Sequence, residues 1–231
     1  MSLILHLDTS STVCSVALAD QGKLIAVQET YEPRAAAALL AVFIKGVMDE
    51  AGKSFSELDA VAVSKGPGSY TGLRISVAAA KGLCYAADKP LIAIDTPIAM
   101  ASAWILQQGI SPSVDTLLVP LIDARRMEVY GAVLDLNLNY VEGIRAEVLE
   151  KGSFDIEPEK PRVLFGDGAE KAIVFFDGKD SVKFDEKFMH TACGLIKPAL
   201  DSYVSRKFED LNHFEPFYLK EFVGTTRSGK A

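Results

Sequence analysis

Acidic and hydroxyl side chains follow the first apolar segment of the chain. Residues 3–7 are continuously apolar, and Asp8, Thr9 and Ser10 come directly after them. A carboxylate with hydroxyls between two strands can coordinate Mg²⁺ and phosphate oxygens, although the same residues also stabilise turns, and we favour the turn. Asp123 follows a second apolar segment in the same way. Asp8 and Asp123 could therefore form a carboxylate pair across a cleft and support acid–base chemistry.

A glycine-rich segment, Gly-Pro-Gly-Ser-Tyr-Thr-Gly-Leu-Arg at 66–74, is a second candidate. It joins an apolar strand at 60–63 to a helix of small residues that we expect over Leu73–Ala87. Such a turn can hold an anion, but it lacks the lysine of a Walker A loop and the glycine spacing of a dinucleotide-binding loop. We favour a turn that sets helix packing and keep anion binding as the alternative. The residues expected to shape it are Gly66, Pro67, Gly68, Ser69, Thr71, Gly72 and Arg74.

No group of residues has the spacing of a metal site. The three histidines, His6, His190 and His213, are scattered, and none lies at ligand spacing from Cys, Asp or Glu. His6 falls within an apolar strand, where we expect a satisfied core histidine. The three cysteines lie in apolar runs without CxxC spacing, which predicts reduced thiols. The sequence thus predicts neither a metal nor a cofactor.

Composition predicts a cytoplasmic globular protein. The chain has 231 residues, is 49% hydrophobic and carries a net charge of −7, which argues against a broad surface for nucleic acid. No apolar run approaches the roughly 18 residues of a membrane span, and we expect no signal peptide. The order apolar strand, Asp turn, second strand occurs twice, at Leu3 and again at Thr116. This repeat suggests two related halves, with 107–115 as the best linker.

Two helices of the first half have faces suited to packing against a further element. The large apolar residues of the expected helix Arg34–Ala51 spread over roughly 240° of its circumference, more than one core contact needs. The excess fits a partner chain or the other lobe of the same chain equally well. In the second helix, Gly72, Ser76 and Ala80 repeat at a spacing of four, which lets another helix approach closely.

Several of these segments resemble the bacterial TsaB (YeaZ) family. The similarity covers roughly Met1–Val133 well and becomes sparse beyond Leu134, and the glycine-rich segment is its most specific part. The segments that carry the resemblance are 4–11, 14–18, 66–74, 78–82 and 121–125, with 166–168 and 216–219 as weaker matches.

The resemblance implies an actin-like, sugar-kinase-like (ASKHA) α/β fold of two related lobes, each a mixed β-sheet flanked by helices. We expect residues 1–106 to form the N-terminal lobe, with the glycine-rich segment and the partner-binding helices. Residues 107–231 would form a smaller, degenerate C-terminal lobe whose tail packs back. The vestigial cofactor-binding candidates are Asp8, Thr9, Ser10 and Asp123.

The resemblance also implies a non-catalytic role in forming threonylcarbamoyladenosine beside the anticodon of tRNAs that read codons starting with A. In that family TsaB pairs with its catalytic paralogue TsaD, the ATPase TsaE joins them, and TsaC makes the adenylate. We expect tRNA contact only through the complex, and a homodimer when TsaD is absent. The family's heterodimer uses the first two helices of each partner. The expected interface residues are Leu39, Leu40, Phe43, Val47, Gly72, Ser76, Ala79, Ala80 and Leu83.

Two enzyme classes are the alternatives. A Mg²⁺-dependent kinase or ATPase would use Asp8 and Asp123, but Arg125 and Arg126 would crowd a phosphate there. A glycopeptidase is the weaker alternative, because the chain offers neither nucleophile nor metal ligands. TsaD carries an HxxxH metal motif where this chain has 34–38, which contains no histidine. Family members often carry polar residues where the alanines of this segment stand, which leaves partner binding by this helix face open.

Overall fold

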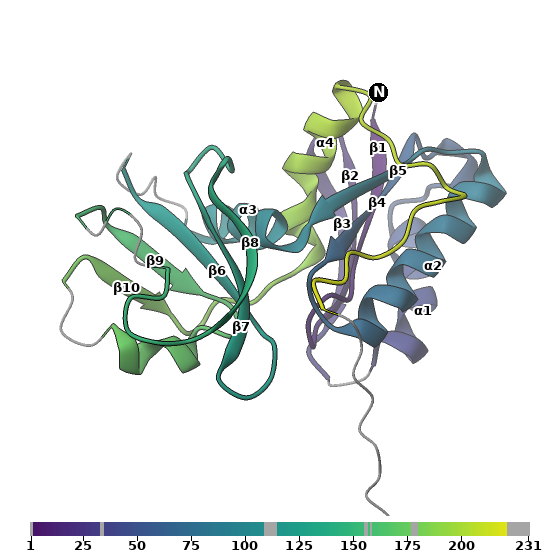
Figure 1. The fold of residues 1–231 in the computed structure, drawn as a ribbon. Coiled ribbons are helices and arrows are strands. Elements are labelled where there is room, and N and C mark those ends of the chain that lie inside the picture. Colours follow the sequence, from purple (N-terminus) through teal and green to yellow (C-terminus); the bar gives the residue numbers. More distant parts are fainter. Residues whose placement is uncertain are drawn as a thin grey trace, which may run out of the picture.

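A computed structural model describes residues 2–32, 35–108, 115–154, 157, 159–176 and 180–220. These residues form two five-stranded mixed β-sheets, placed on either side of helix α3 (Figure 1). The strands of the first sheet are β1 Leu3–Asp8, β2 Cys14–Asp20, β3 Lys23–Thr30, β4 Ala60–Gly66 and β5 Leu91–Asp95. The strands of the second sheet are β6 Leu117–Asp123, β7 Glu128–Leu134, β8 Tyr140–Val148, β9 Arg162–Phe165 and β10 Val182–Asp185.

The two sheets have the same topology. The first has the order β3-β2-β1-β4-β5, and the second, taken from its other edge, has the order β8-β7-β6-β9-β10. In each sheet the first strand is antiparallel to the second and parallel to the fourth strand in chain order. Strands β1 and β6 are equivalent and end at Asp8 and Asp123. The predicted two-lobed α/β fold is therefore confirmed.

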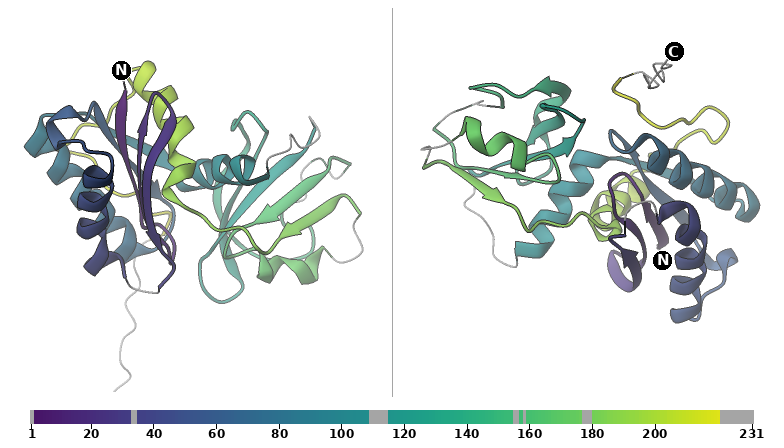
Figure 2. Two further views of the ribbon diagram at one scale, coloured as in Figure 1. Left: turned by 180° about the vertical axis from the view of Figure 1, so that it is seen from behind. Right: turned by 90° about the horizontal axis from the view of Figure 1, so that it is seen from below.

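Helices cover both faces of the first sheet (Figure 2). Helices α1 (Ala36–Glu50) and α2 (Tyr70–Ala87) pack on one face, because alternate strand residues such as Leu5 and Val63 turn their apolar side chains toward them. On the other face, Ile4 and Ile92 pack with the start of α3 (Thr96–Gln108), with η3 (Ala192–Leu195) and with α4 (Ile196–Val204). Both faces are buried, which explains the continuous apolar run of β1.

The helix boundaries differ slightly from the predicted ones. Helix α2 starts at Tyr70 rather than Leu73, because the Ser69 hydroxyl accepts a hydrogen bond from the Gly72 N–H at 3.2 Å and caps the helix one turn earlier. Helix α1 ends at Glu50, and the predicted start at Arg34 lies outside the described residues. The proposed linker also falls largely outside them, since description stops at Gln108 and resumes at Asp115.

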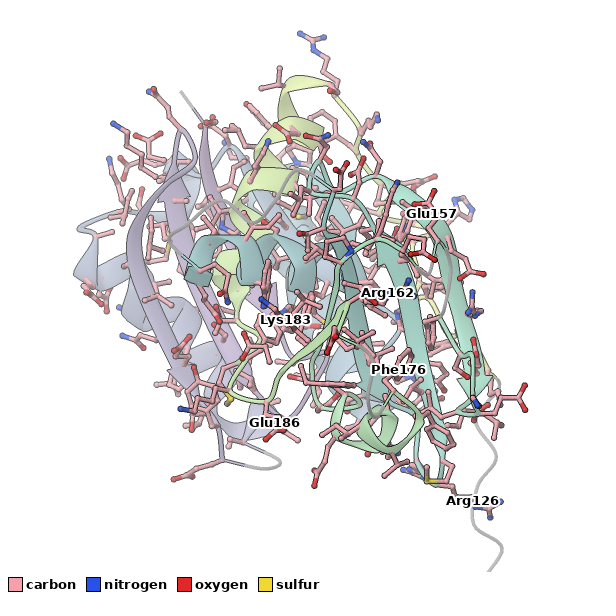
Figure 3. All side chains as sticks on the ribbon, turned by 90° about the vertical axis from the view of Figure 1, so that its left-hand side faces the viewer. Arg126, Glu157, Arg162, Phe176, Lys183 and Glu186 are labelled. Carbon is pink, nitrogen blue, oxygen red and sulfur yellow. The ribbon has the colours of Figure 1, made fainter. Side chains whose placement is uncertain are left out.

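The second sheet has thinner helical cover. Helix α3 packs on one face, where Trp104 stacks on Phe165 with ring centroids 5.7 Å apart. The other face is covered by the short 3-10 helix η2 (Glu170–Phe175) and by loop side chains. Arg162, the first residue of β9, is buried. Its guanidinium donates to the carbonyl oxygens of Phe154 and Glu157, both at 2.8 Å (Figure 3).

The C-terminal segment returns to the first lobe. The Glu209 N–H donates to the Leu91 carbonyl at 2.9 Å, and the Phe217 N–H donates to the Lys65 carbonyl at 2.7 Å. Between these two points the Phe214 side chain enters the first core. We call residues 209–220 the C-terminal strap. Among the described residues, no helix has the length and apolar character needed to cross a bilayer.

Candidate functional site

A cleft of about 920 Å³ lies between the two lobes. Its walls come from both equivalent strand ends, from the starts of α1 and α2, and from the end of the strap. The residues of the first lobe that line it include Thr9, Ser10, Ser11, Thr12, Gly68, Ser69, Tyr70 and Thr71. Opposite them lie Asp123, Arg125, Glu128, Tyr130 and Asp167, and the strap adds Phe217, Tyr218, Leu219 and Lys220.

The glycine-rich segment packs directly against the turn after β1. The Ser69 N–H donates to the Ser10 carbonyl at 2.7 Å, and the Thr9 hydroxyl donates to the Gly72 carbonyl at 2.7 Å. A Cβ on Gly68 would lie 2.3 Å from the Ser10 oxygen, and one on Gly72 would lie 1.9 Å from the Thr9 oxygen. Glycine is needed here because two backbones touch. These contacts favour the packing interpretation over an anion site.

The same segment also holds the strap. The sequence analysis expected the tail to pack back but did not assign its contact to this segment. A Cβ on Gly66 would lie 2.4 Å from the Phe217 carbonyl oxygen, and the φ of Gly66 is +122°. The Tyr70 and Tyr218 rings lie 4.9 Å apart, and the Arg74 guanidinium lies 4.7 Å from the Tyr70 ring centroid. The sequence signal for this contact was an aromatic residue within the glycine-rich segment, Tyr70, and another in the strap, Tyr218.

Asp8 is buried and fully engaged within the protein. Its side chain is 2% exposed, and Oδ1 accepts from the Ser10 N–H at 2.9 Å and from the Ser10 hydroxyl at 2.8 Å. Oδ2 accepts from the Ser64 hydroxyl and lies 2.7 Å from His190 Nε2. Burial disfavours the charged form, but the nearby His190 and these hydrogen bonds outweigh it, so the pKa of Asp8 lies below its usual value.

Asp123 occupies the equivalent position but faces the cleft. Its carboxylate is 41% exposed and is paired with the ammonium of Lys171. Its backbone N–H donates to Asp167 Oδ1 at 2.9 Å. The structure therefore does not bring Asp8 and Asp123 together as a carboxylate pair, because the Asp8 carboxylate turns inward to His190 while that of Asp123 turns outward to Lys171.

The histidines divide into three different environments. His6 is buried in the core, as predicted, but it is not fully satisfied, because Nδ1 lies 3.3 Å from the Ala17 carbonyl oxygen while Nε2 has no hydrogen-bond partner among the described residues. Burial lowers its pKa to about 4. His213 is exposed, with Nδ1 2.8 Å from Asp210 Oδ2. His190 is the one that the sequence analysis missed, because its acidic partner is distant in the chain. Within the described ranges, no group of three His, Cys, Asp or Glu side chains is arranged to hold a metal ion.

The predicted interface needs a correction. Five of its members are buried in the chain's own core, because they lie on the helix faces turned toward the first sheet, and a docked partner cannot reach them: Leu40, Val47, Gly72, Ser76 and Ala80. Four others are half-buried, and the last three of them pack against the first core: Leu39, Phe43, Ala79 and Leu83. The outer faces of the helices are instead formed by Val42, Ala78, Gly82 and Tyr85, of which Tyr85 is 85% exposed.

Comparison with known proteins gives the family. A family model described as TsaD, tRNA N6-adenosine threonylcarbamoyltransferase, matches residues 32–151, just over half of the chain. The tRNA threonylcarbamoyladenosine biosynthesis protein TsaB of Buchnera aphidicola is 30% identical over 192 residues, which is 80% of this chain and 86% of that protein. The chain belongs to the TsaB family. Its segment 32–151 also relates it to TsaD.

Two further comparisons extend over nearly the whole chain. The TsaB of Escherichia coli is 29% identical over 95% of both chains. The solved structure of YeaZ from Pseudomonas aeruginosa superposes with a TM-score of 0.78 at 26% identity, covering 95% of this chain and all of that one. The duplicated topology is that of the actin-like, sugar-kinase-like fold class expected for the TsaB family.

Proposed function

We propose that this chain is a non-catalytic subunit in the formation of threonylcarbamoyladenosine in tRNA. In this proposal it binds a TsaD-type transferase, which carries out the chemistry, and TsaE joins the pair. The names of its relatives support the pathway. The observation that carries the non-catalytic role is the engagement of Asp8. Both of its oxygens are bonded inside the protein at the strand end where a phosphotransferase of this fold would need an accessible carboxylate.

The outer face of α1 and α2 is the proposed docking surface. It offers Val42, 57% exposed, and Tyr85 beside the small residues Ala78 and Gly82. A Cβ on Gly82 would meet nothing within 4 Å, so a helix of the partner can approach α2 closely there. The TsaD family model matches residues 32–151, which include both helices, and this relation supports TsaD as the proposed partner; a second copy of this chain would use the same face when TsaD is absent.

The test combines binding with reconstituted activity. Ala78→Glu and Tyr85→Glu place carboxylates on the docking surface without entering the core, and Val204→Glu on α4, 74% exposed in the native chain, is the matched control. We expect the first two variants to lose TsaD capture and modification of tRNA by TsaD, TsaE and TsaC, and the control to keep both. Transfer of threonylcarbamoyl by this chain alone, or normal TsaD capture by both docking variants, would refute the proposal.

The second candidate is a Mg²⁺-dependent kinase or ATPase, favoured only by the size of the cleft and by the hydroxyls of Thr9 to Thr12 on its wall. Calorimetry with ATP and Mg²⁺ separates the two. Asp123→Ala is the informative variant, because Asp123 faces the cleft whereas Asp8 is buried. Tight binding that this variant abolishes would favour the enzyme.

A further inference from the structure

The turn between β6 and β7 has an unusual backbone for its residues. Arg125 and Arg126 occupy its centre with φ values of +73° and +51°. Two consecutive residues with positive φ are the mark of turns that favour Gly, Asn and Asp, because a Cβ is crowded there. A left-handed conformation is unfavourable for an ordinary residue. Two arginines at this turn therefore oppose the stability of the fold, and a role in binding explains their presence.

The two arginines also carry the unbalanced charge of the turn. The neighbouring acids are already neutralised, since Asp123 pairs with Lys171 and Glu128 pairs with Lys220. Arg125 and Arg126 are exposed, and neither makes an ion pair with an acid within the described part of the chain. The remaining acid nearby, Asp167, lies at the base of the turn and accepts the backbone N–H of Asp123. The tip of the β6–β7 turn thus presents the guanidinium groups of Arg125 and Arg126 to solvent.

Their position allows a large partner to reach them. Arg126 lies at the outer end of the second lobe and points away from the sheet (Figure 3). Arg125 lines the opening of the cleft. Adjacent guanidinium groups on a protruding turn suit phosphate groups, which they bind with two parallel hydrogen bonds each.

We propose that Arg125 and Arg126 form a phosphate-binding tip that contacts the sugar–phosphate backbone of the tRNA during modification. This inference rests on the proposed function, which brings a tRNA to the complex. The net charge of −7 disfavours a broad RNA surface on this chain. A local contact to one or two phosphates positions the RNA without reading its sequence. In this proposal the chain itself contacts the tRNA, whereas the sequence analysis expected tRNA contact only through the complex.

The double variant R125N/R126G separates binding from folding, because it removes both charges and installs residues that accept positive φ. We expect its Tm to rise while the affinity of its complex with TsaD for unmodified tRNA falls, by several-fold at low salt in fluorescence anisotropy. The slope of log K against log salt should become shallower by about 1–2, as expected for the loss of one or two phosphate contacts. R125K/R126K keeps both charges but not the paired hydrogen bonds, so its salt slope should stay near the native value while its affinity falls less than that of R125N/R126G. The control K183Q/K187Q removes two exposed lysines elsewhere on the second lobe and should leave the slope unchanged.

Two results would overturn the proposal that the tip binds the phosphates of tRNA. One is an unchanged affinity and salt slope in R125N/R126G; the other is an equal loss in the lysine control. Weaker capture of TsaD by R125N/R126G with unchanged tRNA affinity would assign the arginines to a protein contact instead. Failure of the native chain to capture TsaD counts against the proposed function alone, and the same anisotropy series on the chain by itself then decides the tip.

Discussion

His190 Nε2 lies 2.7 Å from Asp8 Oδ2 in the interior of the protein, although 182 residues separate them along the chain. Asp8 ends β1 in the first lobe, and His190 lies where the chain returns from the second lobe to η3. Next to the pair, the Ala192 N–H donates to the Ser15 hydroxyl at 3.0 Å. The pair therefore fastens the returning chain to the first sheet.

Removal of one partner should be costly. His190→Ala leaves the buried Asp8 carboxylate without the imidazole that lies 2.7 Å from its Oδ2, and we expect the free energy of unfolding to fall by about 3 kcal/mol. Urea unfolding at pH 7 measures the change. His213→Ala is the control, because this exposed histidine contacts Asp210 at the surface and its loss should cost less than about 0.5 kcal/mol. Equal stability of the two variants would show that the buried pair contributes nothing.

Stability should fall on acidification, and His6 sets the window. Burial lowers the folded-state pKa of His6 to about 4 from 6.5, so the unfolded chain binds the proton first as the pH falls. Stability is complete above about pH 6.5 and decreases by about 3 kcal/mol by pH 4. Asp8, whose folded pKa lies below 3.8, adds a further loss at lower pH. The urea concentration at the unfolding midpoint should decrease from pH 7.5 to pH 4 in the native chain and in His213→Gln. In His6→Gln this decrease should be much smaller.

The sequence predicted local patterns well and distant contacts poorly. The repeated strand and Asp turn revealed the equivalence of Asp8 and Asp123, because strand, turn and strand are encoded within about twenty residues. The repeat did not reveal that His190 meets Asp8, since only the return of the chain from the second lobe to the first sheet creates that contact. Nor did the apolar arc of α1 tell which residues face the chain's own sheet, so buried Leu40 and Val47 were assigned to a partner.

The glycines of the second helix should respond in opposite ways to alanine. Gly72→Ala places a Cβ 1.9 Å from the Thr9 carbonyl oxygen, and because this oxygen belongs to the backbone, the contact cannot relax cheaply. We expect a loss of more than about 3 kcal/mol or insoluble protein. Gly82→Ala meets open space in the middle of the helix and should gain about 0.5–1 kcal/mol from helix propensity. Thermal unfolding compares the two, and a tolerant Gly72→Ala would contradict the close backbone approach.

The C-terminal strap should be anchored by one of its two phenylalanines. Phe214 is 8% exposed and packs in the first core, and its carbonyl accepts from the Lys81 ammonium at 2.8 Å, whereas Phe217 is 38% exposed and is held through its backbone. We expect Phe214→Ala to lower the free energy of unfolding by about 3 kcal/mol and Phe217→Ala by less than about 1 kcal/mol.

Limited proteolysis of the folded variants distinguishes anchoring from general packing. If Phe214 holds the strap, Phe214→Ala should expose 209–220 to cleavage under native conditions while the remainder of the chain stays protected. Uniform sensitivity along the whole chain would mean that Phe214 supports the first core as a whole. Rapid cleavage of the strap in Phe217→Ala would show that the strap is held at the cleft wall rather than by Phe214. The contacts that hold it there would be the Tyr70–Tyr218 ring contact and the Phe217 backbone hydrogen bond.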